Sequence, residues 1–200
     1  MRNNKWILVF FIFSSSFVHA QDDDMGLYKK KERFFSLYLS AGPGYFASSK
    51  GAPDYLQPEV SKWQPFYNVR IMWHPSHRVS MGIETGFITF YSYNFKDSLG
   101  KKGKLSFQSI PILVEYSFPL TKRLSIYAGS GIYLLYTELD YGGHSKAQKI
   151  SPGWVAAASY SVPLTKRSQI AVETKWLYAS ETSNGSICLQ LQYVWKFLKW

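Results

Sequence analysis

Large apolar side chains alternate with other residues along the last stretch of the chain, ICLQLQYVWKFLKW at 187–200. A period of two places successive residues on opposite faces of a β-strand. One face would carry Ile187, Leu189, Leu191, Tyr193, Trp195 and Phe197, and the other Gln190, Gln192 and Lys196. The segment therefore predicts a strand with one fully apolar face, which must lie against lipid or a protein core.

Similar alternation in earlier segments predicts eight strands in all. They run over about 33–46, 64–74, 78–93, 104–118, 124–138, 151–162, 168–180 and 186–199. Three connections are short turns, WHPSHR at 73–78 and a PLTKR turn that occurs at 119–123 and again at 163–167. The remaining connections are predicted as loops over 47–63, 94–103, 139–150 and 181–185. Short turns at one end and longer loops at the other predict an all-β fold, an eight-stranded antiparallel up-and-down transmembrane β-barrel.

Charged residues within the predicted strands fall on the face opposite the apolar one. They are Arg70, Glu84, Glu115, Glu173 and Lys175, and Gln190 and Gln192 occupy the same face of the last strand. A basic side chain that faced lipid would cost about 2 to 4 kcal/mol at the midplane. The interior of an eight-stranded barrel is just wide enough for side chains to fill it. We therefore predict that these residues form an interior polar network, with Tyr127 and Tyr133 as further partners.

The first residues predict export. Arg2 and Lys5 precede a short apolar run that ends in small residues before Gln21, which is the pattern of a cleaved signal peptide. The apolar run is shorter than the ~20 residues that a spanning helix needs. The predicted organisation is a signal peptide at 1–20, a short N-terminal periplasmic segment at 21–32 and an outer-membrane β-barrel at 33–200, integral to the bacterial outer membrane.

Composition fits a membrane barrel. Aromatic residues make up 18% of the chain, as expected where rings line both membrane interfaces. We expect Tyr193, Trp195, Phe197 and Trp200 to act as a C-terminal assembly signal for the barrel assembly machinery. The net charge is +10, but the basic residues are spread over turns and loops. This distribution indicates contact with the anionic headgroups of outer-membrane lipid and no nucleic-acid partner.

Few residues point to catalysis. Cys188 is the only cysteine, so no intramolecular disulfide and no cysteine metal cluster is expected. His74 and His77 flank Pro75 in a short turn, and His144 follows two glycines. Because no histidine is expected inside a strand or against a serine, the sequence predicts no enzyme, no cofactor and no metal site.

Three phrases resemble one family of small bacterial barrels. VSMGIETGFITFYS at 79–92, LSFQSIPILVEYSF at 105–118 and KRLSIYAGSGIYLLY at 122–136 are similar to the PorT-like outer-membrane β-barrel domain family. The resemblance implies an integral outer-membrane barrel, and the founding member of the family is associated with a protein secretion system. No catalytic motif accompanies it, so no functional residue is transferred.

The expected function is a non-enzymatic structural or interaction role, with an envelope or secretion protein as partner. The predicted loops 50–65 and 137–149 are long enough to carry such contacts. Two alternatives stay open at this point. One is a narrow small-solute channel, and the other is a soluble exported ligand-binding barrel of lipocalin type, whose apolar side chains would point inward.

Overall fold

The computed structural model describes residues 33–47, 61–75, 79–96, 100–180 and 184–199. The predicted segments 1–20 and 21–32, and Trp200, lie outside the described residues. No helix in the described part of the chain is long and apolar enough to cross a membrane. The strands are β1 (Phe34–Phe46), β2 (Trp63–His74), β3 (Ser80–Lys96), β4 (Lys102–Pro119), β5 (Leu124–Asp140), β6 (His144–Pro163), β7 (Ser168–Ala179) and β8 (Asn184–Lys199).

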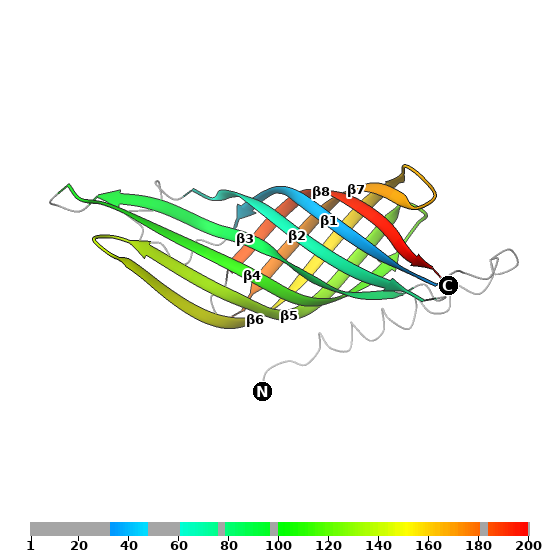
Figure 1. Cartoon of the computed structure of the whole chain (residues 1–200), viewed down its shortest axis with the longest axis horizontal. Coiled ribbons are helices and arrows are strands. Elements are labelled where there is room, and N and C mark those ends of the chain that lie inside the picture. The colour runs from blue at the N-terminus through cyan, green and yellow to red at the C-terminus, as the bar shows by residue number, and fades with distance from the viewer. Residues whose placement is uncertain (1–32, 48–60, 76–78, 97–99, 181–183, 200) are drawn as a thin grey trace, which may run out of the picture. The chain divides into compact units, whose positions relative to one another are not determined.

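These strands close into a barrel (Figure 1). Each strand pairs antiparallel with the next along the chain, and β1 also pairs with β8. Leu37 of β1, for example, lies opposite Ile71 of β2 and opposite Trp195 of β8. The predicted eight-stranded up-and-down barrel is confirmed. Closure pairs the backbone amides of the ring internally, as hydrocarbon requires.

The apolar faces of the strands point outward. Leu191 of β8 is 60% exposed, whereas Gln190 and Gln192 beside it are buried. Exposed aromatic side chains lie near both ends of the barrel wall: Trp63, Tyr67 and Trp154 toward the longer connections, and Tyr116, Tyr160 and Trp195 toward the short turns. Two such belts are typical of a barrel whose ends meet two membrane interfaces.

A bulge in β3 changes the direction of one predicted side chain. Alternation from Val79 predicts that Tyr91 faces outward, and this is wrong. The register with β4 shifts between Thr89 and Tyr91, so that Phe90 and Tyr91 are both buried in the barrel. One extra residue in a strand moves every later side chain to the other face.

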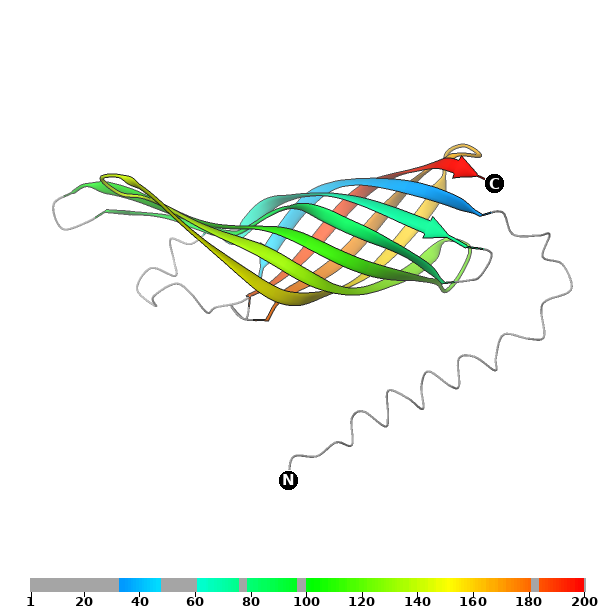
Figure 2. The same ribbon diagram turned by 60° about the horizontal axis from the view of Figure 1, so that its bottom comes forward.

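Four strands are longer than the sequence predicts. In Figures 1 and 2, β3, β4, β5 and β6 continue together past the end of the other four strands. The last pair between β6 and β7 is Gly153 with Ala179, but β6 begins nine residues earlier, at His144. We call the part beyond the barrel the projecting sheet, comprising residues 93–96, 102–105, 136–140 and 144–149.

The predicted loop 139–150 is therefore wrong over most of its length, and the predicted loop 94–103 is wrong at 94–96 and 102–103, while 97–99 lie outside the described residues. Asp140 pairs with His144, and only 141–143 turn the chain, with Gly142 at φ 63°. Lys96 likewise pairs with Lys102. Residues 144–149 are exposed on both faces, so this segment lacks the apolar alternation by which the other strands were predicted.

Candidate functional site

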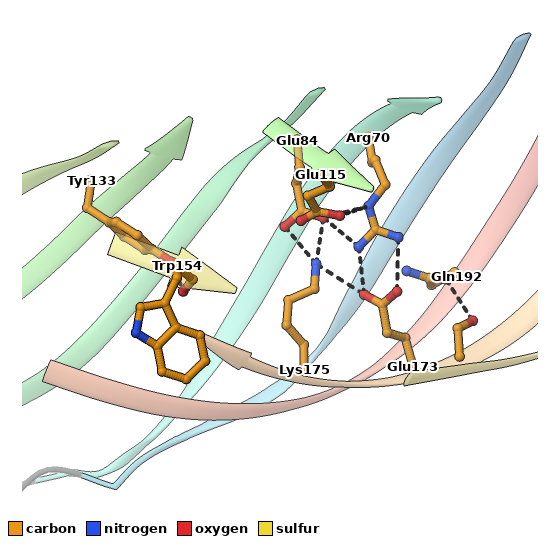
Figure 3. A network of polar contacts seen from close by, with 9 residues as sticks. Arg70, Glu84, Glu115, Tyr133, Trp154, Glu173, Lys175 and Gln192 are labelled. Carbon is orange, nitrogen blue, oxygen red and sulfur yellow. Dashed lines mark hydrogen bonds and ion pairs between the residues drawn. The ribbon is translucent and has the colours of Figure 1, made fainter. Parts of the chain in front are cut away.

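The barrel interior is filled by side chains in successive layers. The inward residues of β2 pass through all of them: Phe66, Asn68, Arg70, Met72 and His74. Arg70 lies in the middle layer, among Glu84 of β3, Glu115 of β4 and Glu173 and Lys175 of β7, all with fully buried side chains. We call these five residues the charge cluster. Figure 3 shows their charged groups pointing toward one another across the lumen.

Arg70 and Lys175 connect opposite walls of the barrel. The Arg70 guanidinium donates to both oxygens of Glu173, over 3.0 Å from Nη1 and 2.9 Å from Nη2. Its Nε donates to Glu84 over 2.8 Å. Lys175 Nζ donates in turn to both oxygens of Glu84, over 2.6 and 2.5 Å. The two-pronged contact with Glu173 is the strong form of an ion pair, because both of its hydrogen bonds are charge-assisted.

Glu115 is held less well than the other two carboxylates. One of its oxygens lies 2.8 Å from Arg70 Nε, but neither oxygen has a hydrogen-bond partner among the described residues. The Nε–H bond points instead to Glu84. The charge cluster contains three carboxylates and two cations. One acid is therefore in excess, and Glu115 is the group with the weakest contacts.

Gln190 and Gln192 lie in the lumen, but neither makes a described hydrogen bond to the charge cluster. Gln192 accepts a long bond, 3.4 Å, from Ser159. The Gln190 amide has no hydrogen-bond partner within the described ranges. The sequence thus places all seven residues on the inner face, and the structure brings five of them into direct contact. Tyr133, a predicted partner, donates instead to the backbone carbonyl of Trp154 over 3.0 Å.

Below the charge cluster, toward the short turns, two tyrosines cover Arg70. The guanidinium carbon lies 4.4 Å from the ring centre of Tyr127 and 5.5 Å from that of Tyr38. Met72 and Val194 complete this buried group, which we call the tyrosine layer. A cation over an aromatic face is attracted to the ring, so the layer adds to the attractions that hold Arg70.

Above the charge cluster, toward the projecting sheet, most of the large side chains in the lumen are apolar. Buried side chains from several strands meet there: Phe46, Phe66, Ile88, Phe90, Tyr91, Phe107, Leu113, Tyr133, Leu135 and Leu177. We call this group the aromatic layer. The Tyr133 ring fits because Gly153 has no side chain; a Cβ there would lie 2.4 Å from the ring. The middle and upper lumen is therefore packed.

The short-turn end of the lumen holds a small cavity, which we call the vestibule. Its volume is about 160 Å³, and all eight strands and the turn at 120–123 contribute to its lining. His74 at the end of β2 lies between two serines, with Nε2 2.6 Å from Ser36 Oγ and Nδ1 2.8 Å from Ser80 Oγ. The expectation that no histidine meets a serine is wrong, because strand register brings together residues 38 positions apart.

The sequence contains one pattern that could have predicted the vestibule, although the alternation of apolar and polar residues does not reveal it. Serines recur at inward positions beside the short turns, at Ser36, Ser80, Ser117, Ser125, Ser159 and Ser161. Small polar residues at the same depth of successive strands indicate a wet end of the lumen. His77 lies outside the described residues. Within the described ranges no group of three or more His, Cys, Asp or Glu could hold a metal ion.

The two faces of the projecting sheet differ in chemistry. The outward face carries Lys96, Lys102 and Lys104, which line an open groove of about 700 Å³ with Asn94 and Asp140. On the other face the rings of Tyr91, Tyr93 and Phe95 follow one another, 6.5 and 6.1 Å apart. This row begins in the aromatic layer and reaches Tyr141, whose ring centre lies 5.6 Å from that of Phe95.

Lys146 and Glu138 form an exposed ion pair across β5 and β6. Their charged atoms are 2.9 Å apart, and the side chains are 56% and 31% exposed. The hydrogen bond from Lys146 lowers the pKa of Glu138 below its usual value. Glu138 lies opposite Lys146 in the pairing of β5 with β6. The ion pair therefore connects the two arms of an ordered hairpin where the sequence predicts a loop.

Part of the proposed assembly signal can be located. Tyr193, Trp195 and Phe197 face outward near the short-turn end of β8 and are 46%, 46% and 37% exposed. Trp200 lies outside the described residues. Cys188 is a free thiol, buried in the same core cluster as the residues of the aromatic layer.

Solved structures with similar folds include bacterial outer-membrane proteins. The chain is similar to Ail, the attachment invasion locus protein of Yersinia pestis, in its complex with the heparin analogue sucrose octasulfate. That match has a TM-score of 0.52 at 11% identity and covers 84% of this chain and 99% of that one. A major outer membrane protein from Thermus thermophilus matches with a TM-score of 0.51 at 9% identity, over 82% and 99%. At these identities the likeness establishes the fold, that of outer-membrane β-barrels.

No protein-family model and no curated protein sequence matches the chain.

Proposed function

We propose that this chain is a non-enzymatic outer-membrane protein that acts through contacts outside its lumen, with the projecting sheet as its main contact surface. The observation that carries this proposal is the contrast between a packed lumen and an ordered sheet that continues past the barrel. Side chains close the lumen at the charge cluster and at the aromatic layer. The projecting sheet, by contrast, presents lysines on one face and aromatic rings on the other.

The finer form of the proposal is an envelope or secretion assembly of the PorT-like kind. Its support is the resemblance of 79–92, 105–118 and 122–136 to that family. The partner would be a protein or glycan at the outer surface, and Ail, which shares the fold, is described with a sulfated heparin analogue. We further propose that residues 1–20 are removed on export and that the last strand carries the assembly signal.

The two alternative functions fit the side-chain arrangement less well. A steady channel needs a continuous aqueous lumen, which larger barrels provide, and here Arg70 and Glu173 meet across the middle of the lumen. A soluble ligand-binding barrel places apolar residues inside. Here the ionised groups lie inside and residues such as Ile83 and Leu191 lie outside, 59% and 60% exposed.

Site-specific photo-crosslinking in intact cells tests the proposal. A crosslinking amino acid replaces Tyr141 at the tip of the projecting sheet, Trp63 at the same end of β2, or Lys166 in a short turn as the matched control. The proposal predicts discrete adducts from Tyr141 and Trp63 and none from Lys166. Adducts from Lys166 alone would overturn it, as would no adduct from any site in protein that shows the gel mobility of a folded barrel.

A further inference from the structure

The vestibule has a lining suited to a small anion. Lys122 and Lys196 belong to the lining, with Lys196 Nζ 5.0 Å from the ring centre of Phe34, and six serines and Thr121 carry hydroxyl groups there. No aspartate or glutamate belongs to the lining of this cavity as the described residues form it. A cavity that combines two cations and several hydroxyl donors without a carboxylate favours a negatively charged guest.

One buried hydroxyl in the lining stands apart from the others. Ser117 is only 5% exposed and lines the cavity, and its hydroxyl takes no part in the side-chain hydrogen bonds of the other lining serines. A hydroxyl group that lines a cavity bonds to water or to a guest where no protein group reaches it. The nearby serines differ, since Ser36 and Ser80 bond to His74 and Ser159 bonds to Gln192. The Ser117 hydroxyl is thus available to a guest.

We propose that the vestibule is a binding site for a small oxyanion, a carboxylate or phosphate group that enters from the short-turn end. Ser117 would donate a hydrogen bond to the oxyanion, and Lys122 and Lys196 would balance its charge. The cavity volume of about 160 Å³ compares with roughly 30 Å³ per water molecule in the liquid. The space accepts one anionic group with a few waters, or the charged end of a longer molecule.

The tyrosine layer separates this site from the charge cluster. Tyr38 and Tyr127 line the inner end of the vestibule and lie against Arg70 on their other side. The excess carboxylate of the charge cluster therefore lies beyond two aromatic rings. Lys122 and Lys196 are the charged residues among those that the described residues contribute to the vestibule lining.

Catalysis at His74 is not part of the proposal. A histidine between two serines can accept a proton from one of them, but acyl transfer also needs donors for the developing oxyanion. Ser36 pairs with Met72 and Lys196, and Ser80 at the start of β3 pairs with Ser117, so neither serine lies in a turn whose backbone amides would converge on an oxyanion. A binding role needs only the side chains that line the cavity.

The repeated PLTKR turn provides a matched control. Lys122 in the first copy lines the vestibule, whereas Lys166 at the equivalent position of the second copy does not. The two lysines share charge, turn sequence and rim. Substitution of each by glutamine therefore separates a specific effect on the vestibule from a general effect of positive charge at this end of the barrel.

Isothermal titration calorimetry on the full chain, folded in nanodiscs of zwitterionic lipid, tests the site with inorganic phosphate and with acetate as probes. We expect saturable one-to-one binding of at least one probe, with Kd near about 1 mM or tighter. Ser117→Ala and Lys196→Gln should each weaken binding about tenfold, the loss expected for a hydrogen bond to a charged group. Lys122→Gln should weaken it less, since Lys122 is exposed, and Lys166→Gln should leave it unchanged.

Two results would overturn the proposal. One is the absence of saturable binding of either probe to the wild-type chain up to about 10 mM, which would show a cavity that holds water only. The other is an equal loss of affinity in Lys122→Gln and Lys166→Gln, which would show unspecific attraction to the rim. Gel mobility of the folded barrel checks that each variant keeps its fold. The proposed function involves the opposite end of the molecule, so either proposal can fail without the other.

Discussion

The same ion pair, a lysine and a glutamate on different strands, occurs in two opposite surroundings in this protein. In the lumen Lys175 lies 2.5 Å from Glu84, and both side chains are fully buried. On the projecting sheet Lys146 lies 2.9 Å from Glu138, and both side chains meet solvent. The distances are similar, but the cost of removing one partner is not. A buried charge left unpaired is far from water, whereas an exposed one is simply rehydrated.

This difference shows which contacts determine the structure of each region. The charge cluster joins β2 and β3 to β7 across the lumen, so its loss affects the whole barrel. The projecting sheet depends instead on backbone pairing and on the tight turn at 141–143, so changes there should stay local. The predictions below test this division, beginning with the largest expected effect.

Removal of Arg70 should have the largest effect. Arg70→Ala leaves three buried carboxylates with Lys175 as their one remaining cation in the charge cluster, and breaking a buried pair costs about 3 to 5 kcal/mol. Urea unfolding from lipid vesicles measures the loss of stability. Arg123→Ala is the control, because Arg123 is an exposed turn residue whose side chain donates to Tyr160. Equal midpoints for the two variants would contradict the role given to the charge cluster.

Two isosteric changes within the charge cluster should differ from each other. Glu173→Gln weakens the paired hydrogen bonds from Arg70 and should cost about 2 kcal/mol. Glu115→Gln removes the acid in excess, which accepts no hydrogen bond from the described residues, and should be neutral or stabilising by up to about 1 kcal/mol. The same unfolding experiment compares them. A greater loss in Glu115→Gln than in Glu173→Gln would contradict the assignment of Glu115 as the weakly held acid.

A turn substitution should disturb the projecting sheet alone. Gly142 has φ 63°, a conformation that costs a residue with a side chain about 1 kcal/mol. Gly142→Ala should therefore speed amide hydrogen exchange in 137–149 and leave exchange in the barrel strands unchanged. Gly143→Ala is the matched control, since a Cβ there meets nothing within 4 Å. Faster exchange throughout the barrel would show that the two regions are coupled.

Removal of the exposed ion pair between Lys146 and Glu138 should have the smallest effect on stability, and this effect should depend on pH. The pKa of Glu138 is lowered by Lys146, so the pair stabilises the hairpin above the usual carboxyl pKa of about 4.3. That contribution is lost as the pH falls through the lowered pKa. Lys146→Gln should abolish the difference between neutral and acidic pH in the protection of the amides at 137–147, measured as the exchange rate relative to the intrinsic rate at each pH. The unfolding midpoint of the whole barrel at neutral pH should not move.

The sequence predicted the barrel because lipid and lumen impose opposite demands on neighbouring residues. Ile83 must face out and Glu84 must face in, and this alternation of apolar and polar residues repeats along the strands of the barrel wall. It locates strands, register and the charged residues of the lumen. It does not say that Arg70 makes its paired hydrogen bonds with Glu173 rather than with Glu115, because that choice depends on the three-dimensional positions of side chains 103 residues apart.

The same reasoning fails where neighbouring residues do not alternate between apolar and polar. Residues 144–149 are exposed on both faces, so their sequence carries no apolar period and predicts a loop. The vestibule escapes prediction for a related reason, because serines and His74 are small or polar residues that a solvated turn would also contain. Only the pairing of β1, β2 and β3 brings Ser36, His74 and Ser80 together.

Conductance in a planar lipid bilayer most directly tests the central claim that the protein acts outside a closed lumen. The wild-type chain, inserted as a folded barrel beside a larger open barrel as positive control, should give no steady current. The reason is that the charge cluster and the aromatic layer fill the barrel interior. A steady, ohmic current from single wild-type barrels would contradict the claim and return the function to a small-solute channel.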